Sequence, residues 1–162
     1  MRFLIRIFII FLLAPLFFTA QTAHAAISIT ATGSWVETID KNDLAAGAGS
    51  DLENTYTSVS GQISIDISGT NGASDAWRVD IRKVDSNWNS NLHPYVMRTS
   101  DGTGGSVSGG TAYLEVTDIN SQFFSGSGDV TGIKVQLRMT GASIQINPAS
   151  YSTVIYYTVV DI

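Results

Sequence analysis

The sequence contains no cysteine and only 2 histidines. A disulfide, a thiolate nucleophile and a lipid anchor on cysteine are therefore all excluded. One histidine, His93, lies in the body of the chain, and no Gly-x-Ser-x-Gly elbow accompanies it. Paired carboxylates of the glycosidase kind remain conceivable, but glutamate is confined to Glu37, Glu53 and Glu115. We predict that the protein has no catalytic residues and is not an enzyme.

Long apolar runs are also scarce, and the single clear one lies at the N-terminus. Residues 7–18 are apolar throughout, Arg2 and Arg6 precede them, and Ala23-His24-Ala25 follows. This order is typical of a secretory signal peptide, whereas a membrane span needs about 20 apolar residues. We predict a signal peptide over residues 1–25 and one mature domain over residues 26–162. A retained N-terminal anchor is the alternative.

Basic residues are also few. Removal of Arg2 and Arg6 reduces the 9 basic residues to 7 against 14 acidic ones, so the mature chain carries 7 − 14 = −7. Such a chain has no electrostatic reason to bind nucleic acid or an anionic membrane surface. We therefore expect no nucleic-acid partner, no membrane span after cleavage, and a secreted or cell-surface location, in the bacterial periplasm or outside the cell.

Alternation of apolar and polar residues dominates the mature chain, and helical periodicity is missing apart from one possible turn at residues 43–46. Period two indicates half-buried strands. Glycine-rich stretches between them, such as residues 100–105 and 125–129, are typical of turns. The predicted strands lie at residues 62–67, 77–82, 112–116, 133–139, 144–146 and 151–162.

Seven or eight such strands predict an all-β fold. Two antiparallel sheets packed face to face satisfy the single polar face of each strand, so we expect a β-sandwich of the immunoglobulin-like or jelly-roll kind. An up-and-down barrel with a ligand cavity is the less favoured alternative.

One acidic loop invites a calcium site. Asp40, Asn42, Asp43 and Asp51 offer oxygen ligands of the type that a hard cation prefers. The spacing is not that of an EF-hand, because no glutamate stands at its twelfth position. A structural Ca²⁺ is therefore a weak expectation beside a solvated loop that uses Asp and Asn for turns, and no other cofactor is expected.

Aromatic side chains are the best sequence argument for a ligand. Exposed tyrosine or tryptophan rings can stack on sugar rings, although many aromatics belong to β-sheet cores. A secreted carbohydrate-binding sandwich is therefore our alternative function. The candidate platforms are Tyr56, Trp88, Tyr95, Tyr113, Tyr156 and Tyr157.

Both ends of the mature chain are predicted strands. Residues 26–36 place Ile27, Ile29, Ala31, Gly33 and Trp35 on one face. The last twelve residues are rich in β-branched and aromatic side chains and contain a Tyr-Ser-x-x-x-x-Tyr-Thr-Val run. Strands at the extreme ends of a chain are suited to strand addition between molecules.

The order of signal peptide, alternating glycine-containing strand, all-β body and closing Tyr-Ser-x-x-x-x-Tyr-Thr-Val strand resembles fimbrial subunits of the chaperone–usher type, including the spore-coat-protein-U-like branch. The resemblance implies a structural surface or matrix subunit that self-associates into fibres, and a periplasmic chaperone that fills the open groove beforehand. It also implies that residues 26–36 act as a donor strand.

The same resemblance assigns the two sets of residues. The donor-strand positions are Ile27, Ile29, Ala31, Gly33 and Trp35. The acceptor-edge positions are Val154, Tyr156, Thr158 and Val160. The alternative is a monomer whose first strand completes its own sheet.

Overall fold

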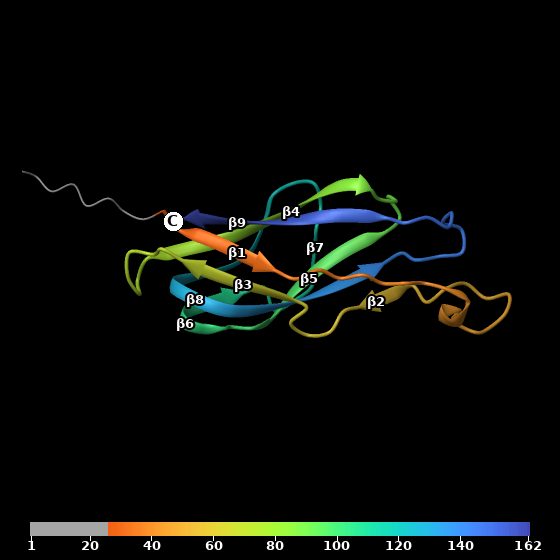
Figure 1. Cartoon of the computed structure of the whole chain (residues 1–162), viewed down its shortest axis with the longest axis horizontal. Helices are drawn as coiled ribbons and strands as arrows, with labels where there is room; N and C mark the ends of the chain where they lie inside the picture. The colour runs from red at the N-terminus through yellow and green to blue at the C-terminus, as the bar shows by residue number, and fades with distance from the viewer. Residues whose placement is uncertain (1–25) are drawn as a thin grey trace, which may run out of the picture.

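The computed structural model describes residues 26–162, so the predicted signal peptide lies outside the described residues. Nine strands and one short 3-10 helix follow one another (Figure 1). They are β1 (Ser28–Thr32), η1 (Lys41–Asp43), β2 (Thr55–Thr57), β3 (Ile63–Ser68), β4 (Ala76–Asn87), β5 (His93–Ser100), β6 (Thr103–Gly109), β7 (Leu114–Glu115), β8 (Ser121–Thr140) and β9 (Ser152–Asp161). The all-β prediction is confirmed.

Strand β8 organises the sheet. Its first part pairs with β4 on one edge and β6 on the other, so that Gly126 faces both Trp77 and Val107. Its second part pairs with β3 and β5 in the same way, so that Val135 faces both Ile63 and Arg98. All the pairings are antiparallel. Hydrogen bonds thus join the nine strands into one sheet, and the predicted division into two sheets is not confirmed.

The change of neighbours along β8 divides the sheet into two halves. We call β4, β6, β9 and residues 121–129 the β4 half, and β1, β2, β3, β5, β7 and residues 130–140 the β3 half. The end strands of the path, β1 and β9, lie side by side (Figure 1). The sheet therefore nearly closes on itself.

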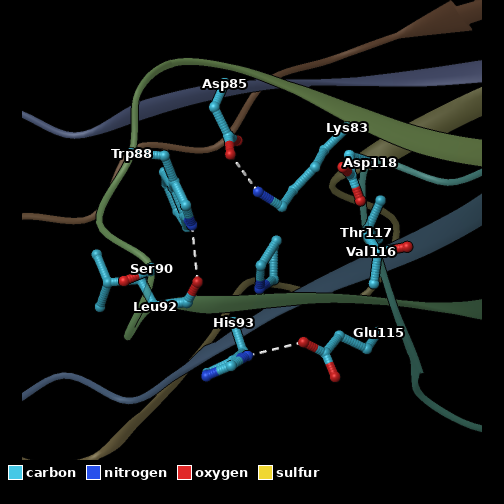
Figure 2. A pocket seen from close by; sticks show the side chains of 11 residues that line it. Lys83, Asp85, Trp88, Ser90, Leu92, His93, Glu115, Val116, Thr117 and Asp118 are labelled. Atoms are coloured by element: carbon cyan, nitrogen blue, oxygen red, sulfur yellow. Dashed lines mark hydrogen bonds and ion pairs between the residues drawn. The ribbon is translucent and has the colours of Figure 1, made fainter.

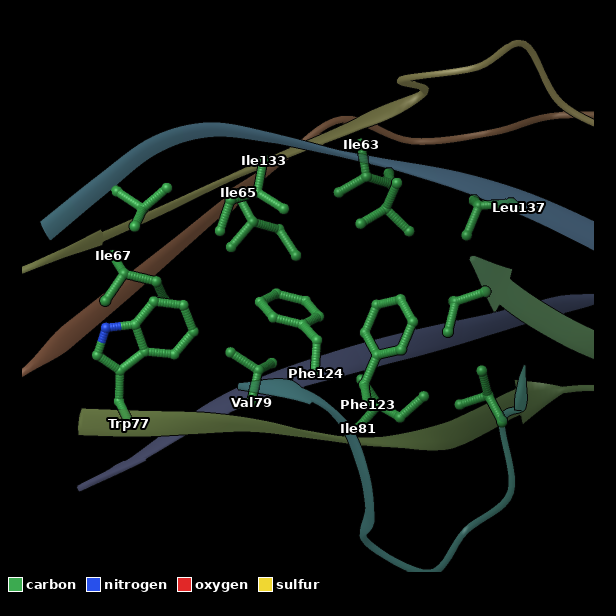
Figure 3. Close-up of a cluster of buried hydrophobic side chains, with 14 residues drawn as sticks. Ile63, Ile65, Ile67, Trp77, Val79, Ile81, Phe123, Phe124, Ile133 and Leu137 are labelled. Atoms are coloured by element: carbon green, nitrogen blue, oxygen red, sulfur yellow. The ribbon is translucent and has the colours of Figure 1, made fainter. Parts of the chain in front are cut away.

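The main core fills the space between the two halves. Figure 3 shows Trp77 and Phe124 of the β4 half beneath the isoleucines of β3. Ile65 and Ile67 are almost fully buried while the residues between and beside them are more exposed, as the alternation predicts. The indole Nε1 of Trp77 donates to the Gly128 carbonyl at 2.8 Å, so the one polar atom of this ring is satisfied.

A smaller cluster lies at the end of the molecule that carries β2. It consists of Tyr56, Leu92, Met139 and Ala142, and Trp88 packs against it. Ser58 closes the boundary between the two clusters, because its hydroxyl accepts the Leu137 N–H at 2.9 Å. This bond links the segment after β2 to β8.

Several local predictions are wrong. Residues 103–105 and 125–129, expected to be turns, belong to β6 and β8, and residues 144–146, expected to be a strand, form a turn. The strand expected at 112–116 is only Leu114–Glu115, and the helical turn expected at 43–46 is the 3-10 helix at 41–43. Among the residues that the structure describes, no helix is long and apolar enough to cross a membrane.

Candidate functional site

A pocket of about 370 Å³ opens between the ends of β4, β5 and β7 (Figure 2). Its volume falls at the lower end of the range of small-molecule sites, about 300 to 1,000 Å³. Aromatic, aliphatic, hydroxyl and charged side chains share the lining. They are Lys83, Asp85, Trp88, Ser90, Leu92, His93, Pro94, Glu115, Val116, Thr117 and Asp118.

Trp88 forms one wall of the pocket. The loop after β4 carries it, and its Nε1 donates to the Leu92 carbonyl at 2.7 Å. This bond fixes the ring on the short loop that joins β4 to β5. Figure 2 shows Trp88 on one side of the pocket and Lys83 with Thr117 on the other. Because its only polar atom is occupied, the half-buried indole offers the pocket an apolar surface.

One ion pair and one hydrogen-bonded histidine–carboxylate pair border the pocket. The Lys83 ammonium contacts the Asp85 carboxylate, and His93 Nδ1 lies 2.7 Å from Glu115 Oε1. Partial burial acts to raise the pKa of Asp85, but hydrogen bonds from Lys83 and Thr153 outweigh it and hold this pKa below its ordinary value. Asp85 is therefore charged at neutral pH.

Backbone hydrogen bonds hold the opposite wall. The Lys83 N–H donates to the Thr117 carbonyl at 2.7 Å, and the Val116 N–H donates to the Pro94 carbonyl at 2.8 Å. These bonds tie the segment after β7 to both β4 and β5. The strand ends and the two loop segments that line the pocket are thus joined by hydrogen bonds.

The sequence analysis proposed six aromatic platforms, and of these only Trp88 lines the pocket. Tyr56 and Tyr157 contribute to the two hydrophobic clusters. The Arg138 guanidinium lies over the Tyr113 ring, 3.4 Å from the centroid of that ring. The Tyr113 hydroxyl donates a hydrogen bond to Gln136 Oε1. Stacking on Arg138 occupies one face of the Tyr113 ring.

The predicted donor strand pairs with β3 of its own chain. Ser28 faces Ser68 and Thr32 faces Ser64 in an antiparallel register. The predicted donor residues differ in their surroundings. Ile27, Ile29 and Trp35 are half-buried against the main core, whereas Ala31 and Gly33 are exposed.

The predicted acceptor-edge residues lie on β9 at the end of the sheet. Ile155, Tyr157 and Val159 pack against the core, and the intervening residues point to the other face. The intervening residues are Val154, Tyr156, Thr158 and Val160. Burial raises the pKa of the Tyr157 hydroxyl far above its ordinary value. Val154 and Tyr156 are about half exposed, at 50% and 46%.

The predicted calcium ligands are occupied by local hydrogen bonds. Asp40 accepts the Asn42 N–H at 2.7 Å, and Asp43 accepts the Asp40 N–H at 2.8 Å, which together cap η1. Asp51 instead accepts the Ile144 N–H at 2.8 Å. No group of three or more His, Cys, Asp or Glu within residues 26–162 is placed to hold a metal ion.

Asp51 gives a testable pH dependence. Hydrogen bonds from the Ile144 N–H, the Leu52 N–H and the Ser143 hydroxyl hold the pKa of its carboxyl below the ordinary 3.8. The stability that it contributes is therefore fully present above the unfolded-state pKa and is lost as the pH falls through the lower folded-state pKa. We expect D51N to unfold at lower urea than the wild type at pH 7, and the difference between the two midpoints to shrink as the pH is lowered through and below 3.8. A difference that does not change with pH would contradict this linkage.

Comparison of the chain with family models, curated proteins and solved structures finds no match. The resemblance to fimbrial subunits therefore rests on the sequence features alone.

Proposed function

We propose that the protein is an exported structural subunit of a bacterial surface or matrix fibre, and that its copies assemble by exchange of β1. In this proposal the chain has no catalytic role, the signal peptide directs it to the periplasm or beyond, and a periplasmic chaperone protects its open edge. The two halves of the sheet act as the layers of an immunoglobulin-like sandwich.

The placement of the terminal strands carries the proposal. In the described chain β1 pairs with β3 alone and β9 with β4 alone, so each leaves one edge without a strand partner. Within β1 only Ile29 packs against the core and the other residues are exposed, while Ile27 and Trp35 on either side of it are half-buried. Departure of β1 would cost little apolar burial, but it would open the edge of β3 beside Ile65 and Ile67. An open edge of this kind is a template for a strand from another molecule.

A disulfide lock tests the exchange. Ser28 and Ser68 face each other, and their hydroxyl oxygens lie 2.9 Å apart. The chain lacks other thiols, so oxidised S28C/S68C should hold β1 on its own β3 by one disulfide. We expect this oxidised variant to stay monomeric in sizing and negative-stain microscopy, and the reduced form to assemble like the wild type.

Single variants S28C and S68C are the matched controls, and both should assemble under reducing conditions. A second variant that lacks residues 26–35 should not form fibres, and a free peptide of those residues should not restore them, because it would fill the open edge of β3 without linking two molecules. Fibres of the oxidised double variant equal to those of the wild type, or a wild type that stays monomeric at every concentration, would refute exchange of β1.

The second candidate is a secreted carbohydrate-binding module. The observation that favours it is the Trp88 pocket, and it does not depend on assembly.

A further inference from the structure

We propose that the Trp88 pocket binds a neutral saccharide of one or two sugar units. This proposal does not rest on strand exchange, because β4, β5 and β7 build the pocket within one chain. It concerns the chemistry of the lining, which combines one aromatic surface with fixed polar groups of both signs.

The aromatic wall matches the apolar side of a pyranose ring. Trp88 is half-buried, and the hydrogen bond to Leu92 holds its plane against rotation. The ring also packs on the smaller cluster, so little conformational entropy remains to be lost when a ligand binds. Leu92 and Pro94 add further apolar side chains to the lining.

The polar rim matches the hydroxyl groups of a sugar. Each sugar hydroxyl can donate one hydrogen bond and accept others, so a sugar needs donors and acceptors close together. The Lys83–Asp85 and His93–Glu115 pairs place a donor beside an acceptor at two points of the rim. Both pairs are partly exposed, so they remain open to a ligand.

The charge of the lining favours a neutral ligand over an anionic one. Asp85, Glu115 and Asp118 face one permanent cation, Lys83, so the pocket carries 1 − 3 = −2 with His93 neutral. A uronic acid or a phosphorylated sugar would meet this charge at short range, and like charges repel. The pocket should therefore discriminate against acidic sugars.

Titration of the mature chain, residues 26–162, with glucose, N-acetylglucosamine and glucuronate tests the proposal. The readout is the backbone amide resonances of the lining residues Ser90 and Thr117 by NMR, together with the indole N–H resonance of Trp88 in the wild type, at a protein concentration where sizing gives a monomer. We expect saturation by at least one neutral probe with a Kd of about 1 to 10 mM, and at least about fivefold weaker binding of glucuronate.

Two variants locate the site. W88L keeps an apolar side chain against the smaller cluster but removes the stacking surface, and it should weaken binding of the neutral probe about tenfold. D118N keeps the shape of the rim and should reduce the discrimination against glucuronate by about two- to threefold. The matched control is Y113L, an aromatic outside the pocket, which should bind the neutral probe like the wild type.

The proposal is overturned if neither neutral probe shifts the Trp88 resonance of the wild type at concentrations up to about 50 mM. This outcome needs no variant, because it sets a lower limit on the Kd of the wild type. It is also overturned if Y113L loses as much affinity as W88L. The oxidised S28C/S68C monomer separates the two proposals, because it should bind sugar normally. Sugar binding by a wild type that forms no fibres would refute strand exchange alone. Fibre formation by a wild type that binds no sugar would refute the saccharide site alone.

Discussion

W77A is expected to lower the free energy of unfolding by about 3 to 5 kcal/mol, the range measured for large aromatic residues truncated in closed cores. Trp77 has no exposed surface, and it is the largest of the fully buried side chains. Its ring meets Phe124 edge to face with centroids 6.1 Å apart. Truncation would leave a cavity between the two halves and would remove the donor to the Gly128 carbonyl.

Urea unfolding followed by far-UV circular dichroism measures this loss. The matched control is Y156A, an aromatic on the outer face of β9 that is 46% exposed and contacts Arg82. Y156A should lower the free energy of unfolding by no more than about 1 kcal/mol. A W77A loss of less than about 1.5 kcal/mol would mean that the two halves do not enclose a packed core.

G126A is expected to destabilise the protein by about 3 kcal/mol or more, beyond the usual range for one added methyl group. Gly126 lies in β8 between Trp77 and Val107. A Cβ there would come within 2.2 Å of the Ser106 carbonyl oxygen and 2.5 Å of the Trp77 ring. The first contact is with backbone of β6, so relief requires a shift of a whole strand.

The matched control for G126A is G132A on the same strand. Gly132 has φ of +74° but nothing within 4 Å of its Cβ position, so its substitution carries backbone strain without a clash. We expect a loss of about 1 to 2 kcal/mol for G132A. Thermal and urea unfolding of both variants give the comparison, and an equal loss in the two would show that β6 and β8 do not approach as closely as described.

Alternation was enough to predict the strands that face the core on one side only. The isoleucines of β3 and the apolar residues of β4 repeat at period two, and they are the residues that the two halves bury. The second part of β8 follows the same rule from Ile133 to Met139. In these segments the apolar–polar alternation matches the observed burial, because each strand has one face toward solvent and one face toward the core.

The glycine-rich strands could not be predicted in this way. Gly105 lies within β6, where a Cβ would come within 1.9 Å of the Ser127 carbonyl oxygen. Gly126 lies within β8, where the backbone of β6 and the Trp77 ring occupy the space that a side chain would need. A turn and a close approach require the same residue type. The sequence pattern does not distinguish them until the partner strand is known.

The candidate site was predictable only in part. Trp88 was one of the six candidate aromatic platforms, but Lys83, Glu115 and Asp118 were not predicted to belong to a ligand site. They meet because β7 pairs with β5 and the following segment returns to β4, which are contacts between distant parts of the chain. Residue spacing contains no information about such contacts. The same holds for Asp51, which resembled a metal ligand and instead binds the backbone of Ile144.

The central position of β8 has a consequence for the order in which the chain can fold. Strands β2 to β6 all precede β8, and each takes hydrogen bonds from it, as in the pairing of Ile63 with Val135. A chain that emerges from the ribosome N-terminus first therefore holds these strands without their native partner until about residue 140 is synthesised. Such distant pairing gives a high contact order, which is associated with folding in milliseconds to seconds. During that interval β2 to β6 lack the strand that joins them, so the native sheet cannot form from the N-terminal part of the chain alone.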